Sequence, residues 1–406
     1  MSKKGKALEG IRVADLTHVL AGPFCTMILA DLGAEVIKVE PPEGDDSRQF
    51  GPFATEVGGS GVQSGYFISI NRNKKSICID LKKPEGKQIL KKLLSVSDVV
   101  VENFRPGTMA KLGFSYEELK KIKPDIIYCS ICGFGHDALE GYQSKPAYDL
   151  TAQAYSGLMS VTGPEGGPPC RVGTSVGDIV AGHEAAIGIL AALWYREKTG
   201  KGQHVDVAMV DSLVYILENA IVRYTIFGEI PKPLGTAHPT ITPFEAFETS
   251  DGWLAIPIGN DNLWAEFCRA IDRPELIEDP RFKTNPARCE NRHELIPLVS
   301  EVIKRKTSQE WFDIFERHRL PYSPINTIDK VVADPNINYR GMIAEICQPR
   351  VGKMKIVGTP FRLSETPGEV RSHGPLLGEH TDEVLGSLLG YSAEKIAVLR
   401  EQGIIR

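Results

Sequence analysis

The chain has 406 residues, of which 42% are apolar and 24% charged, with a formal net charge of −5 at pH 7. This length predicts a large core and either two domains or one domain with a large insertion, and the absence of a basic excess disfavours a nucleic-acid partner. The basic N-terminus precedes no apolar run, and no later stretch is typical of a bilayer span, so we expect a cytoplasmic protein without a membrane partner.

Eight cysteines in a chain of this length do not indicate a disulfide framework. Cys129 and Cys132 match Cys-x-x-Cys, but they lie in a strand-like run, where residues three apart point to opposite faces. A second pair that would complete a zinc site is missing from the sequence pattern. We therefore expect core cysteines and no metal site.

Strand-like and helix-like segments alternate through the first half of the chain. This alternation predicts an α/β fold with a large, open, mainly parallel, Rossmann-like sheet. The first loop lacks Gly-x-Gly-x-x-Gly, which disfavours a nicotinamide or flavin enzyme. The expected strands span residues 11–16, 33–40, 76–81, 98–103, 125–132 and 203–209.

Polar and aromatic side chains follow several of these strands, at the edge where ligands collect in such sheets. A basic cluster at the loop before residues 76–81 could meet phosphates or face water, and for an isolated triplet solvation is the commoner outcome. The residues after strands are His18, Asn71, Arg72, Asn103 and Phe104, and the basic cluster is Arg72, Lys74 and Lys75.

Residues 228–243 contain four prolines, which indicates a domain boundary. A hairpin and several helices follow it, typical of a smaller α+β domain. We expect a large α/β domain over 1–227, the smaller domain over 228–330, and a C-terminal return over 331–406 that packs on the large domain.

Asp178 precedes an apolar segment, 179–194, that predicts a helix buried on most of its circumference and ending at Gly200. An aspartate there is most often only an N-cap. However, Thr174 and Ser175 already offer capping hydroxyls, and neighbouring glycines leave space for a ligand. Because the helix N-terminus would hold the carboxylate ionised, Asp178 is a candidate nucleophile.

Several separated motifs together resemble the class III coenzyme A transferases, the formyl-CoA and carnitine-CoA transferase family. The resemblance covers the chain from Leu8 to about Leu389. The matching stretches are Asp15–His18 with Ala21–Pro23, Leu32–Glu40, Asn71–Lys74, Val101–Gly107, Tyr148–Asp149, Gly177–Asp178, Gly200–Gln203 with Val205–Val207, and His238–Pro239.

This resemblance implies that Asp178 attacks an acyl-CoA thioester, giving an aspartyl anhydride and then an aspartyl-CoA thioester, from which the acceptor acid takes CoA. Coenzyme A thioester is then a substrate, and no permanently bound cofactor is expected. Tyr148 would belong to the catalytic site. A mobile loop at Gly259 and Asn260 would supply N–H donors to the oxyanions.

The resemblance also assigns a CoA-binding set and an assembly. Family members are dimers of interlocked rings. The implied CoA-binding residues are His18, Val19, Ala21, Lys38, Asn71, Arg72, Lys74, Lys75, Asn103, Phe104 and Arg105.

Two departures bear on the substrate. Leu20 stands where formyl-CoA transferases carry glutamine, which favours a bulkier or less polar acid than oxalate or formate. Pro41 replaces an arginine that is common in the family, so one phosphate contact is lost and Lys38 could compensate. We expect succinyl-CoA as donor and a substituted or aryl acid, such as benzylsuccinate, as acceptor.

Two alternatives remain open. An α-methylacyl-CoA racemase would share this fold and the aspartate, but racemases place histidine where Tyr148 stands, and a phenol is a poor base near neutral pH. The chain could also be the active member of a heteromeric transferase, as in the benzylsuccinate CoA-transferases, whose motifs are similar. Its partner would then be a related subunit rather than a second copy.

Overall fold

The computed structural model describes residues 5–59 and 61–406, and the chain divides into two compact units. The large unit comprises the chain up to Leu158, Val172–Ile221 and Pro335–Arg406. The small unit comprises Met159–Arg171 and Val222–Asp334. The first excursion into the small unit is short, and it contains the Pro- and Gly-rich stretch from Pro164 to Pro169.

A six-stranded sheet forms the centre of the large unit, and every neighbouring pair of strands is parallel. This confirms the expected α/β fold. The winding of the sheet reverses between its two middle strands, which is where open parallel sheets bind ligands. In spatial order the strands are β5 (Lys74–Cys78), β2 (Glu35–Glu40), β1 (Arg12–Asp15), β6 (Val99–Glu102), β7 (Ile127–Cys132) and β8 (His204–Ala208).

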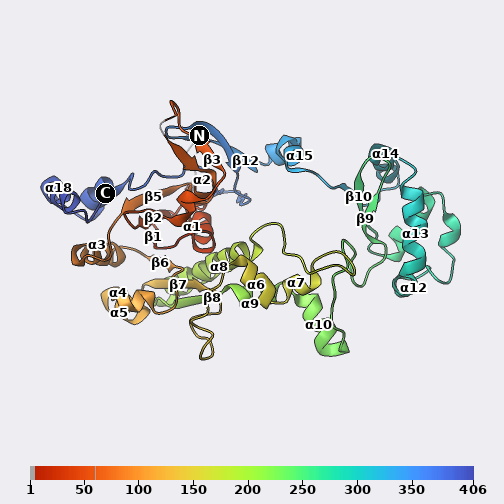
Figure 1. Ribbon diagram of the computed structural model, residues 1–406, viewed down its shortest axis with the longest axis horizontal. Coiled ribbons are helices and arrows are strands. Elements are labelled where there is room, and N and C mark those ends of the chain that lie inside the picture. Colours follow the sequence, from red (N-terminus) through yellow and green to blue (C-terminus); the bar gives the residue numbers. More distant parts are fainter. Residues whose placement is uncertain (1–4, 60) are drawn as a thin grey trace. The chain divides into compact units, whose positions relative to one another are not determined.

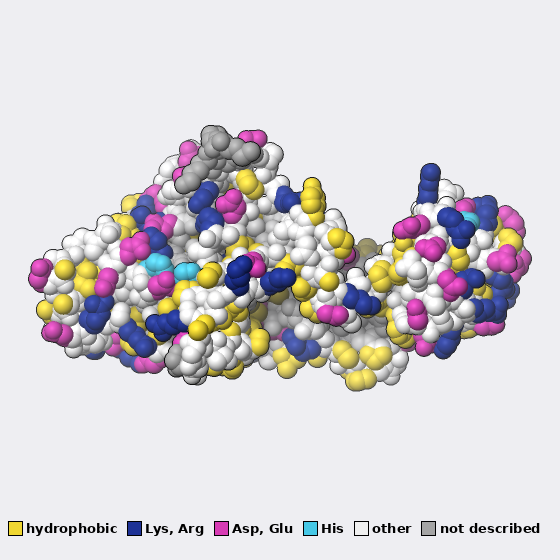
Figure 2. Space-filling view, turned by 90° about the horizontal axis from the view of Figure 1, so that it is seen from above, with side chains coloured by type: hydrophobic (Ala, Val, Ile, Leu, Met, Phe, Trp, Pro, Cys, Tyr) yellow, Lys and Arg dark blue, Asp and Glu magenta, His cyan; other side chains and the backbone are white. Residues whose placement is uncertain are grey.

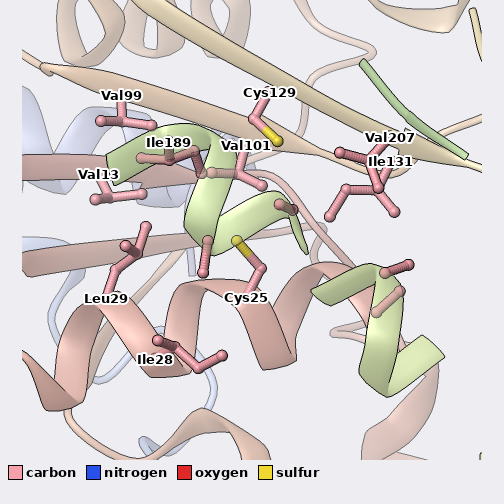
Figure 3. Packing of buried hydrophobic residues seen from close by; sticks show 14 of the residues in the cluster. Val13, Cys25, Ile28, Leu29, Val99, Val101, Cys129, Ile131, Ile189 and Val207 are labelled. Carbon is pink, nitrogen blue, oxygen red and sulfur yellow. The ribbon is translucent and has the colours of Figure 1, made fainter. Parts of the chain in front are cut away.

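One face of this sheet is covered by α1 (Ala21–Asp31), α6 (Asp149–Tyr155), α8 (Val176–Thr199) and α9 (Met209–Tyr215) (Figure 1). The α1 and α8 backbones approach closely because α8 presents small residues: a Cβ at Gly182 would lie 2.8 Å from the Ala21 carbonyl oxygen. Figure 3 shows the core beneath them, where the Cys25 and Cys129 sulfurs point inward. Cys129 is a core cysteine, as the strand pattern predicted, but Cys132 is only half-buried, so the expectation was wrong for that residue.

The other face is covered by helices from the first half of the chain and from its C-terminal end. The tail returns to this core, where Ile405 pairs with Ile79 in an antiparallel bridge. These elements are α3 (Pro84–Ser95), α4 (Thr108–Leu112), α5 (Tyr116–Ile122), α17 (Thr381–Glu383), the π-helical turn η3 (Val384–Leu388) and α18 (Ala393–Glu401).

The remaining elements of the large unit lie outside these two layers. They are the turn η1 (Asp46–Gln49), the hairpin β3 (Phe53–Thr55) and β4 (Val62–Ser64), the helices α2 (Gly65–Asn71) and α16 (Pro335–Tyr339), and the hairpin β12 (Ile343–Gln348) and β13 (Gly352–Val357). On the face seen in Figure 2, acidic and basic side chains are interspersed over each unit.

Helix α8 differs from expectation in its burial. It ends at Gly200 in the left-handed conformation, as predicted, but only the side toward α1 and the sheet is buried. On the other side Ile187 and Trp194 are 65% and 64% exposed. Within residues 5–59 and 61–406, α8 is the one helix with the length and composition of a membrane span, so the expectation of none was wrong on that criterion. Its packing on α1 fits a core helix.

The small unit joins a three-stranded antiparallel sheet to a group of helices. Its core contains Trp264, Phe267, Trp311 and Phe315, and the predicted hairpin and helices are confirmed. The chain passes between the units four times: within α7 (Leu158–Val161), between Arg171 and Val172, within α10 (Glu218–Phe227), and between Asp334 and Pro335. The other elements are β9 (Phe244–Glu248), β10 (Trp253–Pro257), β11 (Ser323–Pro324), α11 (Asp261–Ala270), η2 (Pro274–Leu276), α12 (Asn285–Glu290), α13 (Arg292–Ile303), α14 (Ser308–Arg317) and α15 (Ile328–Ala333).

Candidate active site

The loops after β1 and β6 meet at the reversal of the sheet, and one side chain ties them together. The Asn103 amide accepts a hydrogen bond from the His18 N–H at 2.8 Å and donates one to the His18 carbonyl at 2.8 Å. A cavity of about 230 Å³ opens beside this pair. The predicted residues that line it are His18, Val19, Ala21, Asn103, Phe104, Arg105, Tyr148 and Asp178.

The turn after β1 has a strained backbone. Val19 has a φ of 63°, an unfavourable conformation for a β-branched residue. Asp45 stabilises it by accepting from the Val19 N–H at 3.2 Å. Lys38 in turn pairs with Asp45 at 2.8 Å and donates to the Thr17 carbonyl at 2.7 Å. Lys38 is fully buried, so these contacts indicate that it supports the turn from beneath.

Asp178 lies in the first turn of α8 and faces the cavity. Its carboxyl accepts a hydrogen bond from the Ala21 N–H at the start of α1. Burial, and then the neighbouring charge of Asp149, raise its pKa to about 7. The expectation that the helix N-terminus holds Asp178 ionised was therefore wrong: with its pKa raised to about 7, the carboxyl is only partly ionised near neutral pH.

Asp149 is, after burial, the second reason why Asp178 is not held ionised at the start of α8. Its Oδ1 accepts the Gly177 N–H at 2.9 Å, so Asp149 takes a donor at the start of α8. Gln153 fixes the Asp149 side chain by donating to Oδ1 at 2.9 Å and to Oδ2 at 2.8 Å. The Tyr148–Asp149 motif was recognised in the sequence, but only the tertiary structure brings this carboxylate to the candidate nucleophile.

The basic cluster expected at phosphates is engaged within the protein. Arg72 pairs with Asp31 at 2.7 Å, and Lys74 pairs with Asp15 at 3.0 Å and donates to the Asn71 side chain at 2.9 Å. Lys75 pairs with Glu35 at 2.8 Å and Glu383 at 2.9 Å. Among the described residues that line the cavity, neither Asn71 nor any of these cations occurs. These positions favour a structural role over contact with phosphates.

Two further cavities lie beside the first. Phe104 lines the first cavity and two more, of about 120 Å³ and 320 Å³. The cavity of about 320 Å³ is lined by Pro41, Pro42 and Leu81, with Lys82 and Lys87 beside them. Sequence reasoning missed these two lysines, although Lys82 lies just after the expected strand at 76–81. It also missed Lys145, which lines the first cavity.

The two remaining predicted residues, Gly259 and Asn260, belong to the small unit and follow β10. Asn260 caps α11, because its side chain accepts the Leu263 N–H at 2.9 Å. Tyr148, in contrast, lies at the wall of the cavity with 75% of its surface exposed.

The chain is similar to proteins of known activity over nearly its whole length. A family model described as CoA-transferase family III matches residues 8–381. The succinyl-CoA:glutarate CoA-transferase of Homo sapiens is 42% identical over 401 residues, covering 98% of this chain and 90% of that protein. The succinyl-CoA:mesaconate CoA-transferase of Haloarcula marismortui is 42% identical over 383 residues, covering 93% of this chain and 96% of that protein.

The solved structures agree with this. A CAIB/BAIF family protein from Brucella suis superposes with a TM-score of 0.83 at 38% identity, covering 95% of this chain and 100% of that one. A crystal structure of Rv3272 from M. tuberculosis superposes with a TM-score of 0.82 at 32% identity, covering 93% of this chain and 99% of that one. The resemblance inferred from the separated sequence motifs is thereby confirmed, and the chain belongs to family III of the CoA-transferases.

Proposed function

We propose that this CoA-transferase moves CoA from succinyl-CoA to a carboxylic acid, with Asp178 as the covalent nucleophile. The observation that supports this is the placement of Asp178: its carboxyl lines the cavity at the reversal of the sheet and accepts the Ala21 N–H. A raised pKa makes the ionised carboxylate more basic, which favours attack on a carbonyl carbon.

The proposed reaction has four displacements. The Asp178 carboxylate attacks the thioester carbonyl of succinyl-CoA and expels CoA thiolate, which leaves a mixed anhydride. The thiolate then attacks the aspartyl carbon and releases succinate, so that Asp178 carries CoA as a thioester. The acceptor carboxylate expels the thiolate to form a second anhydride, and the thiolate attacks its acceptor carbon. This last step restores Asp178 and releases the new acyl-CoA.

The neighbouring cavities, all lined by Phe104, support a path for CoA. The thioester would lie beside Asp178, the pantetheine chain along Phe104 and Arg105, and the nucleotide in the cavity near Lys82 and Lys87. The α1 N-terminus would stabilise oxyanions there, because the Ala21 N–H already points at the carboxyl group.

For the acceptor, the relatives named for glutarate and mesaconate favour a small dicarboxylate. Leu20, which lines the cavity beside Asp178, supports an acid with an apolar centre. We propose substituted and aryl acids, such as benzylsuccinate, as a second class of acceptor to be tested beside the small dicarboxylates.

We also propose that the protein works as a dimer of interlocked chains in the cytoplasm. Large apolar side chains on α8 and α9 of the large unit remain in contact with solvent, including Ile187, Trp194 and Tyr215 at 65%, 64% and 79% exposure. A second copy, or a related subunit, would bury this surface. Light scattering on the purified chain tests the proposal, and a monodisperse monomer with full transferase activity contradicts it.

The deciding experiment is mass spectrometry of the Asp178 peptide after incubation with succinyl-CoA, with hydroxylamine as a trap. We expect a CoA adduct or a hydroxamate on Asp178 in the wild-type protein and none in Asp178→Ala. Asp313→Ala is the matched control, since Asp313 is an exposed acid on α14. It should label and transfer as wild type does.

The same protein can be tested for the racemase alternative. Exchange of the α-proton of a 2-methylacyl-CoA in heavy water, without labelling of Asp178 by any donor, would replace the transferase mechanism with proton abstraction. Labelling of Asp178 with no such exchange supports transfer.

A further inference from the structure

Glu102 is a buried carboxylate that the transfer chemistry above does not use. It is the last residue of β6 and is only 1% exposed. Its Oε2 accepts the Phe104 N–H at 2.8 Å, and its Oε1 accepts the Tyr128 hydroxyl at 3.0 Å. The first of these bonds closes the turn that presents Asn103 and Phe104 to the cavities.

A second wall of the cavity approaches the same carboxylate. The loop between β7 and α6 lines the cavity with Gly133 and with Lys145–Tyr148, and it carries His136. The backbone N–H of His136 is held by Asp206 Oδ2 at 2.8 Å. The ring Nε2 lies 3.6 Å from Glu102 Oε1, is buried, and has no hydrogen-bond partner among the described residues.

This is an unusual position for an imidazole nitrogen. A buried nitrogen without a partner carries a desolvation penalty, which a small movement toward Glu102 would remove. The gap is slightly longer than a hydrogen bond, and such bonds often tighten when a ligand binds.

On this basis we propose that Glu102 is a positioning residue for acyl-CoA, which joins the two loops on either side of the cavity through the Phe104 amide and His136. The inference depends on the proposed binding of CoA at this site. When acyl-CoA fills the cavity, Nε2 and Oε1 share one proton in a hydrogen bond, and the turn at Phe104 is fixed against the opposite wall.

The surroundings can supply that proton near neutral pH. Burial raises the pKa of Glu102 to about 7, with a smaller contribution from Asp206, and burial lowers the pKa of His136. Tyr128 and Asp206 face the pair from β7 and β8. His204 lies beside His136, with its ring 6.0 Å away, and is held by Ser130 at 2.7 Å, while Tyr116 of α5 stacks on it.

A purely structural role for Glu102 makes a different prediction. A core carboxylate lost from β6 lowers stability but leaves the affinity of the folded protein unchanged. A positioning residue instead changes the affinity for CoA and the KM of succinyl-CoA, with little change in kcat, because Asp178 and its Ala21 donor remain in place.

The test compares Glu102→Ala, Glu102→Gln, His136→Ala and the double variant Glu102→Ala/His136→Ala, with Glu117→Ala on α5 as an exposed control. We expect a roughly tenfold rise in the succinyl-CoA KM and in the Kd of free CoA for the alanine variants. Glutamine keeps an acceptor for the Phe104 N–H and should restore part of the affinity. The double variant should lose no more affinity for CoA than Glu102→Ala does, since the two residues act through one contact.

The outcomes are distinguishable. Unchanged Kd and KM in Glu102→Gln and His136→Ala, or strictly additive losses in the double variant, overturn the inference. If Glu102→Ala does not fold, Glu102→Gln and His136→Ala still test the inference. If wild-type protein neither binds CoA in calorimetry nor transfers it, the proposed function fails instead.

Discussion

Asp149 and Asp178 place two carboxyl groups at the first turn of α8, and the first of them holds the Gly177 N–H at 2.9 Å. Because Asp149 is only 8% exposed, its negative charge acts on Asp178 through a medium of low polarity. After burial it is the second cause that raises the pKa of Asp178 to about 7. The protein thus keeps a basic carboxylate at the cavity at the cost of incomplete ionisation.

The pH dependence of transfer should report this pair. Only ionised Asp178 attacks the thioester, so kcat/KM should rise with pH through about 7. Asp149→Asn removes the neighbouring charge and should lower the pKa of Asp178, which moves the acid limb down by about 1 pH unit. An acid limb that stays in place or moves upward contradicts this.

Ionisation of Asp178 should have the opposite effect on stability: it raises kcat/KM but lowers the free energy of unfolding. A carboxyl whose pKa is raised in the folded state destabilises the fold when it ionises, so the penalty grows from about pH 4 to pH 7 and is absent below. Asp178→Asn removes this penalty and should raise the free energy of unfolding at pH 8 by at most about 4 kcal/mol. Urea unfolding at pH 4 and pH 8 measures this. Equal effects at both values are inconsistent with the prediction.

Lys74 and Lys75 should differ in their effect on stability. Lys74→Met leaves Asp15 as an unpaired charge in the core and should cost about 3–5 kcal/mol of unfolding free energy. Lys75 is partly exposed in its pairs with Glu35 and Glu383, so Lys75→Met should cost below about 1 kcal/mol. Chemical unfolding tests both. A tenfold rise in the acyl-CoA KM with Lys75→Met would restore its expected role at the phosphates.

Lys82 and Lys87 should contribute to binding of the nucleotide half of CoA. Lys82→Ala/Lys87→Ala removes two positive charges from the cavity of about 320 Å³ and should raise the KM of succinyl-CoA about tenfold. The KM of succinyl-pantetheine, which lacks the nucleotide, should not change. Lys91→Ala, an exposed position on the same helix as Lys87, is the control. Equal losses with both substrates would place the lysines elsewhere in the mechanism.

Local patterns predicted much of this fold because they depend on neighbours in the chain. Alternating strands and helices predicted the parallel sheet, and Gly200 predicted the end of α8. The same reasoning overestimated the burial of α8. An apolar sequence predicts that a surface is shielded from water, but it does not tell whether this chain or another molecule covers that surface. Ile187 and Trp194 are the residues that show the difference.

The candidate site was predicted in part. Asp178 and the residues after β1 and β6 could be found because parallel strands end at one edge of a sheet, and these residues do line one cavity. The basic cluster could not be assigned in the same way. Whether Lys74 meets a phosphate or Asp15 depends on a residue 59 positions away, and no local pattern records that distance.

The sequence by itself thus determined the family, the alternation of strands and helices, and the position of the candidate nucleophile. The tertiary structure decided its electrostatic state and the partners of the buried charges. The physical reason is that helix propensity and apolar periodicity act over a few residues, whereas a carboxyl pKa depends on every charge and dipole that folding brings near it. Asp149 reaches Asp178 across 29 residues of sequence, and only the packing of α6 against α8 makes them neighbours.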